Sequence, residues 1–204
     1  MINCHITAPN PLSHLLNIEL SFNVQRADFI DFFIPSWRPG RYEIAPFAQN
    51  IHDFQAFDQN QSPLLWSKSA PNAWRIELKS STQVNLKYSY FANKMDAGNS
   101  VLDDSQWYIN FINCIFYSHH HENDEIHITL DYPSTYKWVT SLVERENGLL
   151  IAKNYQELVD SPFLASEDIS QMSYDVGACT FTIAINGDCP ISLDELAIHF
   201  QKFT

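Results

Sequence analysis

Three adjacent histidines and a glutamate, His119-His120-His121-Glu122, are the residues whose types most clearly suggest metal chemistry. Imidazole and carboxylate groups are common zinc ligands, but a site needs them to converge, as histidines four residues apart do on a helix. Adjacent side chains on an extended segment point to opposite faces, so this run does not converge. His119, His121 and, across an expected hairpin, His127 are therefore only weak metal candidates. A solvated hairpin end is the favoured interpretation.

Two other segments combine aromatic, proline and charged residues in a way that suggests a binding surface. In residues 35–42, two prolines and a glycine favour a sharp turn that carries large flat side chains and two arginines. In residues 155–162, a helical turn is stopped by Asp-Ser-Pro. Loop packing is the alternative role for both. The candidates for a substrate cleft or an interdomain contact are Trp37, Arg38, Arg41, Tyr42, Glu43, Tyr155 and Asp160.

The sequence lacks the common motifs of catalytic and cofactor-binding sites. It contains no H-E-x-x-H, no G-x-S-x-G, no P-loop and no G-x-G-x-x-G. Asp96, Asp103 and Asp104 do not have the spacing of a calcium-binding loop. We therefore expect no catalytic residue and no cofactor in this chain.

The elements that must position these residues are strands. Apolar and polar residues alternate in residues 16–24, which predicts a strand with one buried face. Half-polar strands indicate antiparallel sheets with one solvated face. We therefore expect an all-β fold, an antiparallel β-sandwich of about eight or nine strands. Further strands are expected near residues 29–34, 74–78, 84–90, 109–117, 126–130, 137–142 and 181–185.

Two helical segments are expected beside the strands. One is a short turn near 154–159, where Asn154 would cap the first turn. The other lies near 192–203, where Ser192 and Glu195 form a capping box. Its apolar residues recur on one helix face and need a partner, either the sandwich or residues that would follow. That stripe consists of Leu193, Leu196, Ala197 and Phe200.

Composition narrows the class of protein. Of 204 residues, 12 are basic and 24 acidic, which gives a net charge of −12 and argues against a nucleic acid or an anionic membrane as partner. No run approaches the roughly 18 apolar residues of a membrane span, and no secretory leader is visible. The four cysteines are interpreted as free thiols of a cytoplasmic protein, with two disulfides as the alternative.

Together, the segments resemble the N-terminal domain of the glycyl aminopeptidase-like zinc metallopeptidases. The resemblance begins with W-R-P-G-R-Y at residues 37–42, followed by F-A-Q-N-I at 47–51. It continues in the family's order over nearly the whole chain. The later landmarks are W-R-I at 74–76, Y-S-Y-F-A at 88–92, Y-K-W-V-T-S-L at 136–142 and Y-Q-E-L-V-D-S-P at 155–162. Gln156, where the family usually has Asp, is a departure, as is the lack of a glycine in residues 163–166.

This resemblance implies a domain organisation and a role. Residues 1–190 would be a β-sandwich N-terminal domain, and residues 191–204 the start of the first helix leading to a catalytic domain that the chain lacks. That domain would carry the zinc site, so the partners implied are the protein's own catalytic domain and peptide substrates. The chain would be a non-catalytic accessory domain that shapes the cleft of a zinc aminopeptidase.

Two other functions remain as alternatives. A stand-alone sandwich could bind a peptide or carbohydrate through a flat exposed row of Trp66, Trp74 or Trp107, although the alternation turns Trp74 inward. A free-standing metal-dependent enzyme would have to use the histidine run.

Overall fold

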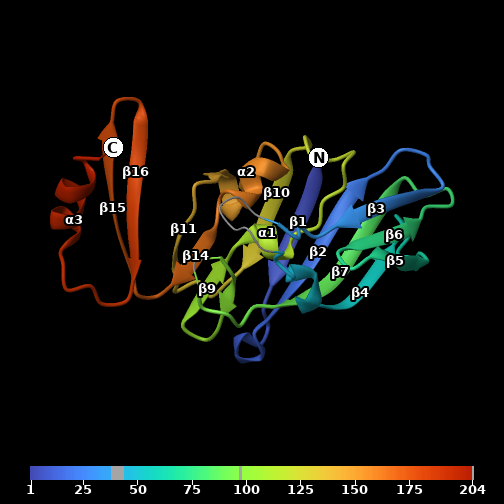
Figure 1. The fold of residues 1–204 in the computed structure, drawn as a ribbon, viewed down its shortest axis with the longest axis horizontal. Helices are drawn as coiled ribbons and strands as arrows, with labels where there is room; N and C mark the ends of the chain where they lie inside the picture. The colour runs from blue at the N-terminus through green and yellow to red at the C-terminus, as the bar shows by residue number, and fades with distance from the viewer. Residues whose placement is uncertain (38–43, 97, 204) are drawn as a thin grey trace.

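The largest sheet has seven strands. A computed structural model describes residues 1–37, 44–96 and 98–203 (Figure 1). The sheet order is β12-β13-β10-β1-β2-β7-β4. The expected alternation of residues 16–24 is confirmed in β2, where every second side chain from Leu16 to Phe22 is buried. The strands are β1 (Ile2–Thr7), β2 (Leu15–Asn23), β4 (Ile51–Phe57), β7 (Gln83–Phe91), β10 (Ile126–Asp131), β12 (Val143–Glu144) and β13 (Leu150–Ala152).

One pair in this sheet is not antiparallel. Strands β1 and β10 run parallel, with Ile2 opposite Ile126. Parallel neighbours need a long crossover, and here the connection between them builds β2, β4 and β7 of this sheet and part of the facing sheets. The sandwich is therefore not purely antiparallel, because alternation along a strand does not specify its neighbour or their relative direction.

Two smaller sheets share a core with the large one. The first has the order β3-β6-β5 and the second β11-β14-β9-β8. The layers meet through buried aromatic rings, as between Phe22 of β2 and Phe32 of β3, whose centroids lie 4.7 Å apart. The all-β sandwich is thus confirmed. The strands are β3 (Phe29–Phe33), β5 (Trp66–Ala70), β6 (Ala73–Glu77), β8 (Val101–Leu102), β9 (Gln106–Ile109), β11 (Lys137–Val139) and β14 (Phe163–Ser166).

More elements occur than expected. The described residues contain sixteen strands rather than eight or nine, because several have only two to four residues and are too short to show alternation. The strand expected over 109–117 is wrong beyond residue 109. The helix α1 (Phe111–Cys114) follows β9, and buried Asn113 donates to Ser100 Oγ (3.2 Å). A short apolar run fits a buried helical turn as well as a strand.

The last elements stand apart from the sandwich. Strands β15 (Ile169–Val176) and β16 (Cys179–Asn186) form a separate hairpin, and helix α3 (Leu193–Phe200) packs beside β15 (Figure 1). Ser192 Oγ accepts from the Glu195 N–H at 3.2 Å, which confirms the predicted cap. The sandwich, one of the two partners expected for the apolar stripe of this helix, does not cover it. The helix packs on the hairpin instead.

The cysteines are free thiols. Cys4 and Cys114 are buried in the sandwich, and burial raises the pKa of both thiols. Cys179 and Cys189 are exposed. Throughout the described ranges, no helix combines the length and apolar character needed to cross a membrane.

Candidate functional site

Helix α2 (Tyr155–Val159) places the second predicted segment. Asn154 caps it, because its Oδ1 accepts from the Glu157 N–H at 2.8 Å. Tyr155 and Leu158 are buried, whereas Asp160 lies exposed at the end of the helix. A polar cap and an apolar inner side therefore fix α2 on the sandwich and direct its last carboxylate outward.

Tyr155 is an anchor of this region. Its hydroxyl donates to the carbonyl of Ile115 (2.9 Å), and its N–H donates to the carbonyl of Glu122 (2.9 Å). Its ring lies 4.9 Å from that of Tyr117. Burial raises the pKa of Tyr155 well above its ordinary value, and the neighbouring Tyr117 adds to this shift. The hydroxyl therefore stays protonated and structural.

The two predicted segments meet at one open pocket. The pocket has a volume of about 350 Å³ and takes lining residues from the segment before β4, from the loop after α1 and from α2. Trp37, which is 60% exposed, lines the pocket together with Gln156 and Asp160. The structure thus brings Trp37, Tyr155 and Asp160 together. Arg38, Arg41, Tyr42 and Glu43 lie outside the described residues.

The pocket carries negative charge. Asp160 Oδ2 accepts from Gln156 Nε2 (2.7 Å), so the residue that departs from the family pattern contacts the candidate carboxylate. Glu122 Oε1 lies 2.7 Å from His119 Nδ1. Two carboxylates beside exposed aromatic surface can bind and orient a cationic group, such as an amine.

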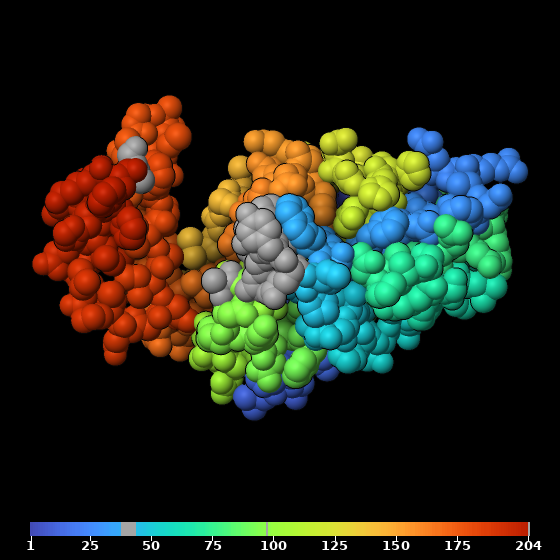
Figure 2. Space-filling model, in the orientation of Figure 1, coloured from blue at the N-terminus to red at the C-terminus, as the bar shows by residue number. Residues whose placement is uncertain are grey.

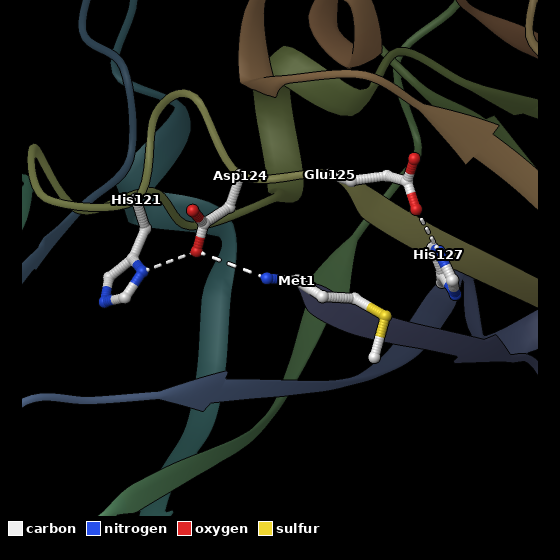
Figure 3. A network of polar contacts seen from close by, with 5 residues as sticks. All are labelled: Met1, His121, Asp124, Glu125 and His127. Carbon is white, nitrogen blue, oxygen red and sulfur yellow. Dashed lines mark hydrogen bonds and ion pairs between the residues drawn. The ribbon is translucent and has the colours of Figure 1, made fainter.

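The histidine candidates do not form one site. His121 Nδ1 bonds to Asp124 Oδ2 (2.9 Å), which also lies 3.5 Å from the N-terminal amine of Met1, and His127 Nε2 bonds to Glu125 Oε1 (2.6 Å) (Figure 3). Each ring, including that of His119, thus has its own carboxylate. In the part of the chain that the structure describes, no three His, Cys, Asp or Glu side chains gather as a metal site would require.

Several lining residues were not predicted. Tyr117 and Asn123 come from the loop after α1, and Glu122 was noted only as part of the histidine run. Their signal is weak, because they reach the pocket through long-range contacts, such as the backbone bond from the Phe33 N–H to the Tyr117 carbonyl (2.8 Å). Sequence spacing does not reveal such a bond.

The aromatic row of the binding-module alternative is not formed. Trp74 and Trp107 are 2% and 1% exposed, and Trp66 alone of the three is accessible, at 42%. Trp74 packs against Phe54 and Phe116 inside the sandwich. These tryptophans therefore do not make a flat platform for a sugar or a peptide.

Comparisons with known proteins bear on the family and the fold. The family model "Peptidase M61 N-terminal domain" matches residues 3–167. Among solved structures, an aminopeptidase N family protein from Idiomarina loihiensis is similar over 99% of this chain, with a TM-score of 0.88 and 21% identity. An M1 zinc metallopeptidase from Deinococcus radiodurans is similar over 90%, with a TM-score of 0.47 and 12% identity. A comparison with curated proteins found no match.

The extent of these matches decides what they show. This chain spans 35% of the Idiomarina loihiensis chain and 46% of the Deinococcus radiodurans chain. At such low identity the first likeness shows the fold, and the second is too distant to support an argument. The family model, in contrast, covers most of the sequence. The chain therefore belongs to the family of peptidase M61 N-terminal domains.

Proposed function

We propose that this chain is the non-catalytic accessory domain of a zinc aminopeptidase, and that its pocket forms part of the wall of the substrate cleft. The family supports a place in a peptidase. The observation that carries the cleft role is the pocket that Trp37 and Asp160 share. Its carboxylates would attract and orient the ammonium group of a peptide, while Trp37 would cover its apolar part.

The chemical step belongs to the domain that would follow. Zinc bound there would supply polarisation of the scissile carbonyl and an activated water. The residues of this chain would bind the substrate, orient it and limit access of water. Because the four thiols are free, we propose the cytoplasm as the compartment.

The test is made in the full-length peptidase with Asp160→Asn. This change keeps the size of the side chain and an acceptor for Gln156, and it removes one negative charge. We expect kcat/KM for an aminoacyl-p-nitroanilide to fall about 5-fold, mainly through KM, because one partly solvated charge contributes roughly 1 kcal/mol. The matched control is Asp28→Asn, an exposed aspartate beside β3.

A second pair of variants tests the aromatic side of the pocket. Trp37→Ala should raise KM, whereas Trp66→Ala, at an exposed tryptophan outside the pocket, should leave KM unchanged. If Asp160→Asn and Trp37→Ala both keep the kcat/KM of the parent enzyme, the cleft role is wrong and the domain serves another purpose.

A further inference from the structure

Residues 169–203 form a structural unit beside the sandwich. Its base is joined to the sandwich by hydrogen bonds from Asn186 Nδ2 to Gln106 Oε1 (3.0 Å) and from Lys137 Nζ to the Ile169 carbonyl (3.0 Å). Among the described residues, the continuous hydrophobic core includes none beyond Ala165, and β15 and β16 pair only with each other. The family model also ends before this unit, at residue 167. The likeness to the Idiomarina loihiensis protein, however, extends over 99% of this chain and so includes the unit. A hairpin outside the N-terminal family domain is therefore retained in the longer relative.

This unit is incomplete by itself. A two-stranded hairpin is marginally stable in water and needs a further strand or an apolar partner. Helix α3 supplies part of that partner beside β15 and buries Ala197. Ile198 of the helix and Phe203 just beyond its end, however, remain 58% and 87% exposed.

The turn of the hairpin determines which backbone N–H groups of β16 point to its free edge. Gly177 and Ala178 form a two-residue loop in which Gly177 has a φ of +63°, so Val176 and Cys179 close the hairpin as a hydrogen-bonded pair. In an antiparallel hairpin, hydrogen-bonded and non-hydrogen-bonded residue pairs then alternate along the two strands. Along β16, the N–H groups of Phe181, Ile183 and Ile185 point toward β15, and those of Thr180, Thr182 and Ala184 point outward.

This edge lacks the usual protection against strand pairing. The eight residues of β16, C-T-F-T-I-A-I-N, include no charge and no proline, which natural proteins use to shield an edge. Helix α3 lies beside β15, so β16 is the open side. In Figures 1 and 2 the hairpin projects as a separate lobe, with β16 toward the sandwich and an open notch between them.

We propose that β16 is the acceptor for a further strand, supplied by the part of the longer peptidase that follows this chain. Residues 169–203 would then begin the next domain, and the boundary would lie near residue 167, earlier than the residue 190 expected from the sequence. The exposed end of α3 would be covered by the same domain. This inference rests on the proposed function, since it requires a longer protein.

Hydrogen exchange tests the proposal residue by residue. In the 204-residue chain, the outward amides of Thr180, Thr182 and Ala184 should exchange without protection. In the full-length peptidase they should exchange at least roughly 100-fold more slowly, because a ladder bond opens only by local unfolding. The inward amides of Phe181, Ile183 and Ile185 are the internal control and should be protected in both proteins.

A pair of proline variants gives an independent readout. Thr182 and Ser173 are opposite each other in the hairpin, and both N–H groups point outward, on opposite edges. In the full-length peptidase, Thr182→Pro removes a proposed ladder bond and should lower Tm and soluble yield. Ser173→Pro removes an outward N–H on the β15 edge and should have a markedly smaller effect.

The outcomes separate this inference from the proposed function. Unprotected outward amides in a full-length protein that cleaves peptides would overturn the strand acceptor and leave the proposed function intact. Protected outward amides in a full-length protein without peptidase activity would support the strand acceptor and overturn the proposed function. Protection that appears in the 204-residue chain and grows with its concentration would identify a second copy as the occupant, and it would also overturn the proposal.

Discussion

At the residue scale, the buried hydroxyl of Tyr155 connects α2 to the segment after α1. In Tyr155→Phe, the Ile115 carbonyl loses its donor while the ring packing is kept. We expect the free energy of unfolding to fall by about 1–2 kcal/mol, the cost of an unpaired buried acceptor. Urea denaturation followed by tryptophan fluorescence measures this.

Tyr108→Phe is the matched control for that substitution. Tyr108 lies half-buried on β9, and its change should shift stability by less than about 0.5 kcal/mol, as is usual away from buried polar contacts. Equal effects at the two positions would contradict the role given to the Tyr155 hydroxyl.

Asp96 makes the stability of the fold depend on acid pH. Although burial acts to raise its pKa, hydrogen bonds from Gly98 N–H and Asn99 Nδ2, together with nearby Lys94, lower it to about 2. A carboxylate with a lowered pKa stabilises the fold above its unfolded pKa of roughly 4, and this contribution is lost as pH falls through about 2.

The lowered pKa of Asp96 determines the result expected for Asp96→Asn. The variant should be less stable than the parent at pH 7, by less than about 1 kcal/mol because the Asp96 side chain is 30% exposed and solvent screens its charge. The difference should shrink between pH 4 and pH 2. Denaturation at several pH values measures it, with Asp28→Asn as the reference, and a difference that does not change with pH would refute the assignment.

At the element scale, the cap of α2 carries both stability and the position of Asp160. Asn154→Ala leaves the Glu157 N–H without its acceptor and should cost about 1 kcal/mol. Asn154→Asp keeps an acceptor at the same place and should restore most of that stability. Thermal unfolding of the three proteins decides this, and an alanine variant as stable as the parent would show that packing alone holds the helix.

Two elements, β2 and α1, show where the local sequence pattern is enough to predict secondary structure and where it is not. Alternation located β2 correctly because one face of that strand is buried and the other is solvated. The same reasoning failed for α1, where the residues face the core on nearly all sides and Asn113 is buried. Period-two alternation requires one wet face, so it carries little information in a fully buried segment.

At the scale of the whole molecule, the sandwich should fold without the C-terminal unit. A chain that ends at residue 168 keeps every residue of the continuous core. We therefore expect its Tm to lie within a few degrees of that of the parent, which corresponds to about 1 kcal/mol. Differential scanning calorimetry of the two proteins is the measurement.

Phe32→Ala provides the contrast for that deletion. Phe32 is fully buried between the layers, and its removal should cost about 3–5 kcal/mol in either chain. Loss of cooperative unfolding in the shortened chain would show that the hairpin and α3 contribute to the stability of the sandwich and are not a separate unit.

The sequence by itself determined those features that depend on neighbours in the chain. Alternation predicted the β-sandwich, the polar residues Asn154 and Ser192 predicted two helix caps, and the ordered landmarks identified the family. Each is a short-range signal, because side-chain direction and cap geometry are set within a few residues.

The tertiary structure alone decided which distant residues meet. It paired β1 with β10 in parallel and placed Trp37 and Asp160 at one pocket. It also gave His119, His121 and His127 a separate carboxylate each, and it left the β16 edge without a further strand among the described residues. These outcomes depend on how the sheets pack on one shared core. Many sequence separations are compatible with such packing, so spacing along the chain does not specify it.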